Sequence, residues 1–350
     1  MQFTKTLTNY IGSISQIGGI KHYRLADGKA KGMDIYEFNN GNGIVFDVIA
    51  DRAMDICHFS YKGSPVSYIS KSGIVSPTYY NREGYEWLGG FFAGLFTTCG
   101  VINAGEPSEY GGRKYGLHGD ISNTPAENIS LKQEWVNDKY SMSISGQMRQ
   151  GMMLFEDILF ERTITCELGG NEICISDKII NEGNKEEPFM LAYHFNFGYP
   201  LINKDSELII AKGEISAFSP DSESFIKDWD KFDTPLSGIE SAYFHKFKKS
   251  SSNKASFLLI NNSKNPQYAF ELEYDAEILD ICIQWRHYIK GEYCLAMQPS
   301  NSFLKGVGAE EENKTLKHIQ PGEEIKNSLK IKVYGEEKDI KAAKKRILNI

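Results

Sequence analysis

The sequence predicts an all-β protein, a large antiparallel β-sandwich. Short runs rich in β-branched and aromatic residues recur along its 350 residues, and Gly, Pro, Asn and Asp separate them. This is the pattern of strands joined by tight turns, and many short strands at regular spacing are typical of sandwiches and barrels. Helical periodicity, by contrast, is sparse.

The strands can be placed in order along the chain. Leu-Gly-Gly-Asn at 168–171 joins two of them and favours a hairpin. The segment 338–348, rich in Ala and Lys, predicts a short surface helix, while three glycines weaken a second helix candidate at 83–92. The predicted strands cover residues 44–50, 58–61, 66–69, 131–135, 140–147, 159–167, 172–180, 189–195, 207–210, 256–260, 268–274, 279–285, 293–297 and 328–333.

The chain shows no Pro/Ser-rich linker, internal repeat or low-complexity segment. We therefore expect a single domain over residues 1–350, with the short C-terminal helix near 338–348. The formal net charge is -7, and Lys and Arg are scattered along the chain. Because a phosphate-binding surface needs clustered basic side chains, nucleic acid is not an expected partner.

Further patterns narrow the class of protein. No apolar run approaches the ~20 residues that cross a bilayer, and the N-terminus lacks the pattern of a signal peptide, so we expect a cytoplasmic protein that does not bind membranes. The six cysteines have no metal-ligand spacing, which predicts free thiols and no metal site. Phosphate loops and dinucleotide fingerprints are absent, so no cofactor is expected.

Two histidine segments carry the most information about function. His194 and Asn196 lie two residues apart in an apolar run, so an extended strand points both side chains to the same face. Such a pair fits either a buried, hydrogen-bonded core pair or the wall of a polar site. His118 lies between Gly116 and Gly119, which leave room for a ligand or for a tight turn.

These segments resemble the galactose mutarotase-like (aldose 1-epimerase) superfamily, and more closely an aldose-epimerase-like branch of it. The matching segments occur in the expected order at residues 50–56, 91–100, 115–127, 193–201 and 297–301. The resemblance implies a large supersandwich fold and, as partner, a free monosaccharide or related carbohydrate. It also implies anomer interconversion by acid/base ring opening, with His194 as acid and His118 as a binder of sugar hydroxyls or a stabiliser of charge.

The chain departs from the family pattern at the position of the general base. Gln298 stands where the related pattern has Glu, and an amide cannot accept a proton at neutral pH. Three interpretations follow: the protein binds or senses sugar without turnover, another carboxylate supplies the base, or the short motif aligns differently. Other isomerase or lyase chemistry on the same fold is a further alternative. The carboxylates nearest in sequence are Glu292, Glu310, Glu311 and Glu312.

Three further residues are candidates for holding the sugar. Arg52, in Ala-Asp-Arg-Ala-Met-Asp-Ile, offers a fork of donors for hydroxyls or a carboxylate, or else forms ion pairs with the neighbouring Asp51 and Asp55. Arg149 is a weaker candidate of the same kind. Trp285 ends an alternating strand, where it either stacks on a pyranose or belongs to the core. Asp177 reads as an outward polar position on a hairpin strand.

Overall fold

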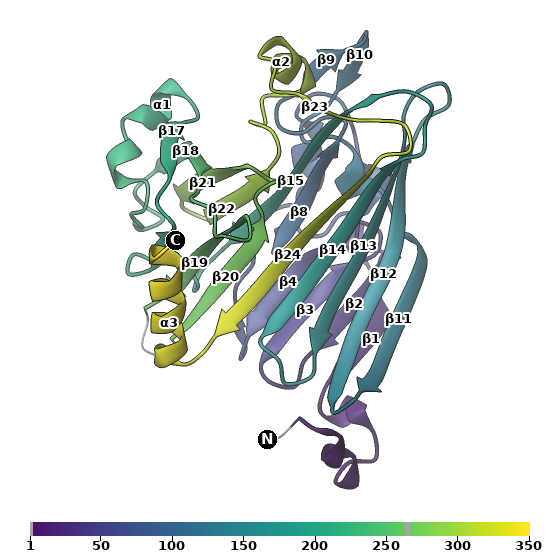
Figure 1. The fold of residues 1–350 in the computed structure, drawn as a ribbon, viewed down its shortest axis with the longest axis vertical. Helices are drawn as coiled ribbons and strands as arrows, with labels where there is room; N and C mark the ends of the chain where they lie inside the picture. Colours follow the sequence, from purple (N-terminus) through teal and green to yellow (C-terminus); the bar gives the residue numbers. More distant parts are fainter. Residues whose placement is uncertain (1–2, 263–266) are drawn as a thin grey trace.

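The computed structural model describes residues 3–262 and 267–350 (Figure 1). Every strand pair among them is antiparallel, as an all-β sandwich requires. The largest sheet has eight strands. Its order is β11 (Glu127–Val136), β12 (Lys139–Gly151), β13 (Asp157–Glu167), β14 (Glu172–Asn181), β24 (Glu324–Tyr334), β20 (Tyr268–Asp275), β19 (Lys254–Asn261) and β16 (Glu207–Ile210).

A seven-stranded sheet carries most of the residues discussed below. It contains β17 (Glu214–Ala217), β18 (Ile239–Lys246), β21 (Ile281–Ile289), β22 (Glu292–Ser300), β15 (Glu187–Phe197) and β23 (Lys317–Ile319), with β8 (Phe96–Val101) paired to β15. The N-terminal sheet has β1 (Gly19–Arg24), β2 (Asp34–Asn39), β3 (Ile44–Ile49), β4 (Asp55–Tyr61) and β5 (Ser64–Pro65). Two short ribbons pair β6 (Tyr68–Ile69) with β7 (Ala93–Gly94), and β9 (Ser108–Tyr110) with β10 (Arg113–Tyr115).

One hydrophobic core joins the three sheets. Along β12, buried side chains alternate with more exposed ones, because successive residues of a strand point to opposite faces. Phe59 of the N-terminal sheet contacts Phe270 of the eight-stranded sheet, edge to face at 5.9 Å between ring centroids, and Phe195 of the seven-stranded sheet lies 6.4 Å from the same ring. Full burial of each ring contributes roughly 1.5–3 kcal/mol.

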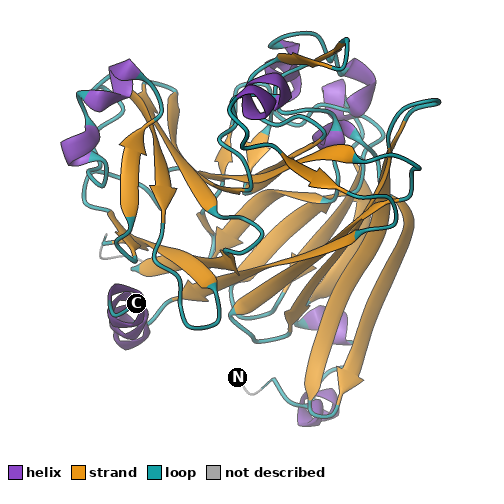
Figure 2. Cartoon of the chain, turned by 45° about the horizontal axis from the view of Figure 1, so that its top comes forward, coloured by secondary structure: helices purple, strands orange, loops and turns teal. Residues whose placement is uncertain are grey.

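Helices are few and lie at the periphery (Figure 2). Two are short, α1 (Pro220–Glu223) and α2 (Val307–Glu312). The third, α3 (Glu337–Leu348), occupies the segment where a surface helix was expected and buries Ile340, Ala343 and Ile347 against β19 and β20. Their spacing of three and four residues makes one apolar stripe. No helix of the described residues is both long and apolar enough to span a membrane.

Each predicted strand overlaps a strand of the structure, whether its burial alternates, as in β12, or is continuous, as in β15. β13 and β14 form the predicted hairpin, with Cys166 paired to Ile173, and the six cysteines are free thiols. The segment 83–92 contains only a 3-10 turn at Glu86–Gly90, because its glycines do not sustain an α-helix. Of the strands with six or more residues, the sequence did not predict β1, β2, β8 and β18, and it also did not predict the shorter β5, β7, β9, β10, β17 and β23.

Asp177 is not an outward polar residue, which corrects the sequence interpretation. It is buried, and its carboxylate accepts hydrogen bonds from Arg162 at 2.8 and 2.9 Å and from the Tyr193 hydroxyl at 2.5 Å. Arg162 also reaches Asp55, at 2.9 Å, whose other oxygen accepts from the backbone amide of Thr98. This buried ion-pair cluster ties the N-terminal sheet to the other two.

Candidate functional site

A cavity of 320 Å³ lies beside the two histidines that the sequence singled out. Six of its residues stand on four neighbouring strands of the seven-stranded sheet, and the rest come from the loops and the 3-10 turn that cover it. The lining comprises Tyr85, Trp87, Leu88, Phe91, Gly105, Glu106, Leu117, His118, His194, Phe218, Glu240, Ala242, Ile283, Trp285, Gln298 and Leu304. A larger hollow of 480 Å³ beside Tyr199 and Tyr293 contains no histidine, so we assign the candidate site to the smaller cavity.

His118 and His194 face each other at the cavity. Their ring centroids are 5.6 Å apart and their planes are nearly perpendicular, at 89°. His118 has a left-handed backbone (φ 57°), and Gly119 follows with φ 71°. A Cβ at Gly119 would lie 2.4 Å from the carbonyl oxygen of Gly100, so only glycine permits this close approach. The glycine beside the Leu-His segment therefore fixes the position of the imidazole.

Both imidazoles are neutral near pH 7. Burial lowers the pKa of His118 to about 3, with the proximity of His194 acting in the same direction. Burial also lowers the pKa of His194 to about 4, against a smaller opposing effect of Asn196. The Gly105 amide donates to Nδ1 of His118 at 3.2 Å. Neutral His118 therefore holds its proton at Nε2, which makes it a hydrogen-bond donor.

Gln298 lies on the strand next to His194. Ala192 pairs with Ser300 and Phe195 pairs with Met297, a register that sets His194 opposite Gln298. Both side chains line the cavity. Among the described residues, Nδ1 of His194 and Oε1 of Gln298 are buried and have no hydrogen-bond partner. Buried polar atoms are normally paired, so these two atoms favour a site that a polar ligand completes.

Asn196 lies two residues from His194 on β15, but it does not line the cavity. Its amide nitrogen donates to the carbonyl oxygens of Ala93, at 3.0 Å, and His194, at 2.6 Å. The structure thus places Asn196 behind His194, where it holds the backbone of β15 against β7.

Trp285 does line the cavity. Its ring centroid lies 6.3 Å from that of His194, and it stacks on His287 at 4.8 Å with 25° between the planes. The indole nitrogen donates to Glu240 at 3.4 Å. Trp285 therefore offers an aromatic surface with a carboxylate beside it.

Arg52 and Arg149 do not line the cavity. The Arg52 guanidinium is buried and donates to the carbonyl oxygens of Ser122, Val75 and Gly90, the last at 3.0 Å. It forms no ion pair with Asp55, which bonds Arg162 instead. Because Gly90 ends the 3-10 turn that carries Trp87 and directly precedes Phe91, Arg52 holds part of the cavity wall in place. Arg149 pairs with Asp157 and Glu182 on the eight-stranded sheet.

Two carboxylates that the sequence reading did not single out line the cavity, Glu106 and Glu240. Glu106 accepts a hydrogen bond from the Tyr85 hydroxyl at 2.6 Å and follows Gly105, the donor to His118. The carboxylates nearest to Gln298 in sequence lie elsewhere. Glu310 is buried and accepts from the Phe303 amide at 2.7 Å, and Glu292 pairs with His287 at 3.0 Å. The sequence around Glu106 and Glu240 contains no pattern that would mark either residue as part of a site.

Comparison with known proteins assigns the family. Residues 30–333 match the family described as Domain of unknown function (DUF4432). The chain belongs to this family. A search of curated proteins gives no significant match.

Several solved structures resemble this DUF4432 protein, and they share its galactose mutarotase-like fold. A provisionally assigned aldose 1-epimerase from Klebsiella pneumoniae superimposes with a TM-score of 0.85 at 22% identity, over 94% of this chain and 86% of that one. A galactose mutarotase-like protein from Clostridium acetobutylicum gives 0.63 at 14% identity, over 92% and 100%. A galactose 1-epimerase from Lactobacillus acidophilus gives 0.56 at 9% identity, over 91% and 99%. At these identities the likeness shows the fold.

Proposed function

We propose that this DUF4432 protein interconverts the anomers of a free monosaccharide by acid/base ring opening in the cavity between His118 and His194. The observation that carries the proposal is the pair of facing imidazoles on an open cavity with unpaired polar atoms. Its volume of 320 Å³ is at the small end of ligand pockets, which run from about 300 to 1,000 Å³. That size suits one sugar ring rather than a chain.

In this proposal the side chains that line the cavity have different roles. Trp285 supplies a surface for the apolar face of a pyranose. His118 donates a hydrogen bond from Nε2 to a sugar oxygen. His194 in its protonated form, a minor fraction near pH 7 because its pKa is about 4, gives a proton to the ring oxygen as the ring opens and takes it back as the ring closes, while the base takes and returns the proton of the anomeric hydroxyl. Positioned acid/base groups of this kind contribute about 10²–10⁴-fold to the rate.

The base in this proposal is Glu106. Gln298 cannot accept the anomeric proton. Glu106 lines the cavity and is joined through Gly105 to His118, whereas Glu240 lies at the Trp285 nitrogen with a side chain that is 60% exposed. Glu240 is therefore the matched control, a second carboxylate on the same cavity but on its solvent side.

The alternative is a protein that binds or senses sugar without turnover. Gln298 favours it, because that amide leaves the family's position for the base without a proton acceptor. Both functions need the same cavity, so the experiment has to measure binding and exchange together.

The test is anomer exchange by NMR, with sugar titration, across a panel of aldoses and uronic acids. The variants are wild type, Glu106→Gln and Glu240→Gln. We expect exchange that falls at least about 10²-fold in Glu106→Gln and little in Glu240→Gln. Binding without exchange over the whole panel would establish the alternative, and the absence of both binding and exchange would refute both functions.

A further inference from the structure

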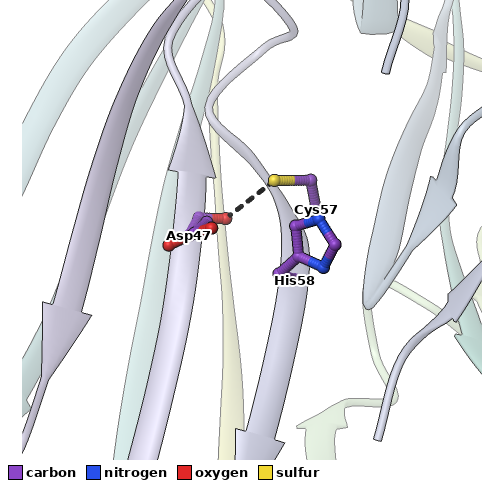
Figure 3. Close-up of side chains that lie close together, drawn as sticks. All are labelled: Asp47, Cys57 and His58. Carbon is purple, nitrogen blue, oxygen red and sulfur yellow. Dashed lines mark hydrogen bonds between the residues drawn. The ribbon is translucent and has the colours of Figure 1, made fainter. Parts of the chain in front are cut away.

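Three side chains on the N-terminal sheet gather chemically distinct ligand atoms in one place (Figure 3). Asp47 lies on β3, and Cys57 and His58 are consecutive on β4. A carboxylate oxygen, the thiol sulfur and an imidazole nitrogen all lie within 4.8 Å of one another. None of the three residues lines the cavity described above.

A β-bulge creates this cluster. Asp47 pairs with His58, but the next pair is Val48 with Ile56, so Cys57 is an extra residue on β4. In a regular strand, consecutive side chains point to opposite faces of the sheet. The bulge breaks that alternation and re-aims a side chain. Cys57 thereby points toward Asp47, and its thiol donates to the Asp47 carbonyl oxygen at 3.5 Å.

The surroundings of the cluster suit a cation. Glu37 stands directly opposite Asp47 on β2, which places two carboxylates side by side, and like charges across a strand pair are unfavourable. The Tyr23 hydroxyl donates to Asp47 at 3.1 Å, as hydrogen-bond donors around metal sites orient a ligating carboxylate.

We propose that Asp47, Cys57 and His58 bind a divalent transition-metal ion of the zinc class. A thiolate, an imidazole and a carboxylate are ligands that zinc accepts, and three protein ligands leave a fourth position for water. With bonds of roughly 2.0–2.3 Å, tetrahedral ligand atoms are about 3.5 Å apart. The cluster therefore has to close by about 1 Å, which the exposed side chain of His58 can supply. Binding displaces the thiol proton to solvent.

The experiment is a titration of the reduced full chain with Co²⁺, whose bond to a thiolate gives a charge-transfer band in the near ultraviolet. We expect one equivalent to bind and Zn²⁺ to displace it. Cys57→Ser removes the band. His58→Gln, at an exposed position that does not endanger folding, weakens binding at least about tenfold.

The matched control is Cys174→Ser, because Cys174 is a more exposed thiol on β14, in a different sheet. It should leave the band and the affinity unchanged. No band in wild type, a band that persists in Cys57→Ser, a band lost in Cys174→Ser or an affinity unaffected by His58→Gln would each overturn the proposal. None of these results depends on the sugar chemistry of the cavity.

Discussion

Replacing Gln298 by Glu tests the candidate site most directly. The substitution is nearly isosteric, and the side chain is 4% exposed with an amide oxygen that has no partner among the described residues. It introduces a proton acceptor where the related family pattern has one. It also puts a negative charge opposite His194 on the neighbouring strand.

The magnitude follows from the strand geometry. Directly opposite residues have Cβ atoms roughly 5 Å apart. At an effective dielectric constant of about 20, opposite charges at that distance attract by about 3 kcal/mol, which corresponds to roughly two pH units. The pKa of His194 should therefore rise from about 4 to about 6. In a protein without a base, which is the binding-protein alternative, a new carboxylate that reaches the anomeric hydroxyl should accelerate exchange by about 10²–10⁴-fold, or about 3–5 kcal/mol of barrier. With Glu106 already acting as the base, as proposed, the gain should be much smaller.

Two NMR measurements on one sample decide the outcome: titration of the histidine ring protons, and anomer exchange on the best sugar of the panel. Gln284→Glu is the matched control. Gln284 is also buried and bonds a histidine of low pKa, His245, at 2.9 Å, but it does not line the cavity. It should raise the pKa of His245 without altering exchange.

The measured pKa and the measured exchange rate can each contradict this placement of Gln298. An unchanged pKa of His194 would refute the placement of the two side chains next to each other. A raised pKa with slow exchange in both wild type and variant would mean that position 298 does not face the reacting carbon, and the binding-protein alternative would gain support. Fast exchange by the wild type would support Glu106 as the base, and Glu106→Gln should then slow it.

Three further predictions concern stability, and all are read from urea unfolding. Arg52→Ala leaves the carbonyl oxygens of Val75, Gly90 and Ser122 without their donor, at a cost of about 1–3 kcal/mol each. The free energy of unfolding should therefore fall by about 3 kcal/mol or more. An unchanged urea midpoint would show that the three hydrogen bonds are not formed. Arg162→Met leaves Asp55 and Asp177 as unpaired buried charges and should cost about 3–5 kcal/mol, whereas a cost below 1 kcal/mol would contradict the ion-pair cluster. In the folded protein the pKa of His194 is about 4, below its ordinary value near 6.5. Its contribution to the free energy of unfolding is therefore complete above pH 6.5 and is lost as the pH falls toward 4. When the pH is lowered from 7 to 5, the free energy of unfolding should therefore fall by roughly 2 kcal/mol less in His194→Gln than in wild type. An equal fall in both proteins would argue against a buried neutral imidazole.

Local patterns determined much of the fold. The alternation of buried and exposed residues in β12, β13 and β14 is a property of each strand by itself, and the glycines at 169 and 170 mark the hairpin between two of them. The stripe of Ile340, Ala343 and Ile347 likewise marks α3. The two histidine segments were recognisable because their glycines and their spacing are also local features.

The tertiary structure alone decided which side chains meet. Arg52, Arg149 and Asn196 carry suitable chemistry, but their partners are backbone carbonyls or carboxylates on other segments of the chain. Glu106 and Glu240 reach the cavity through a loop and through β18, a strand that the sequence reading missed.

The same holds for the buried Asp177 and for the cluster at Asp47. Asp177 is buried because Arg162 and Tyr193 approach it from other strands, and Cys57 turns toward Asp47 because one strand has an extra residue relative to its neighbour. Strand periodicity follows from the backbone of a single segment, so the sequence contains it. Register, bulges and the pairing of buried charges are set by contacts between segments, which a periodicity does not encode.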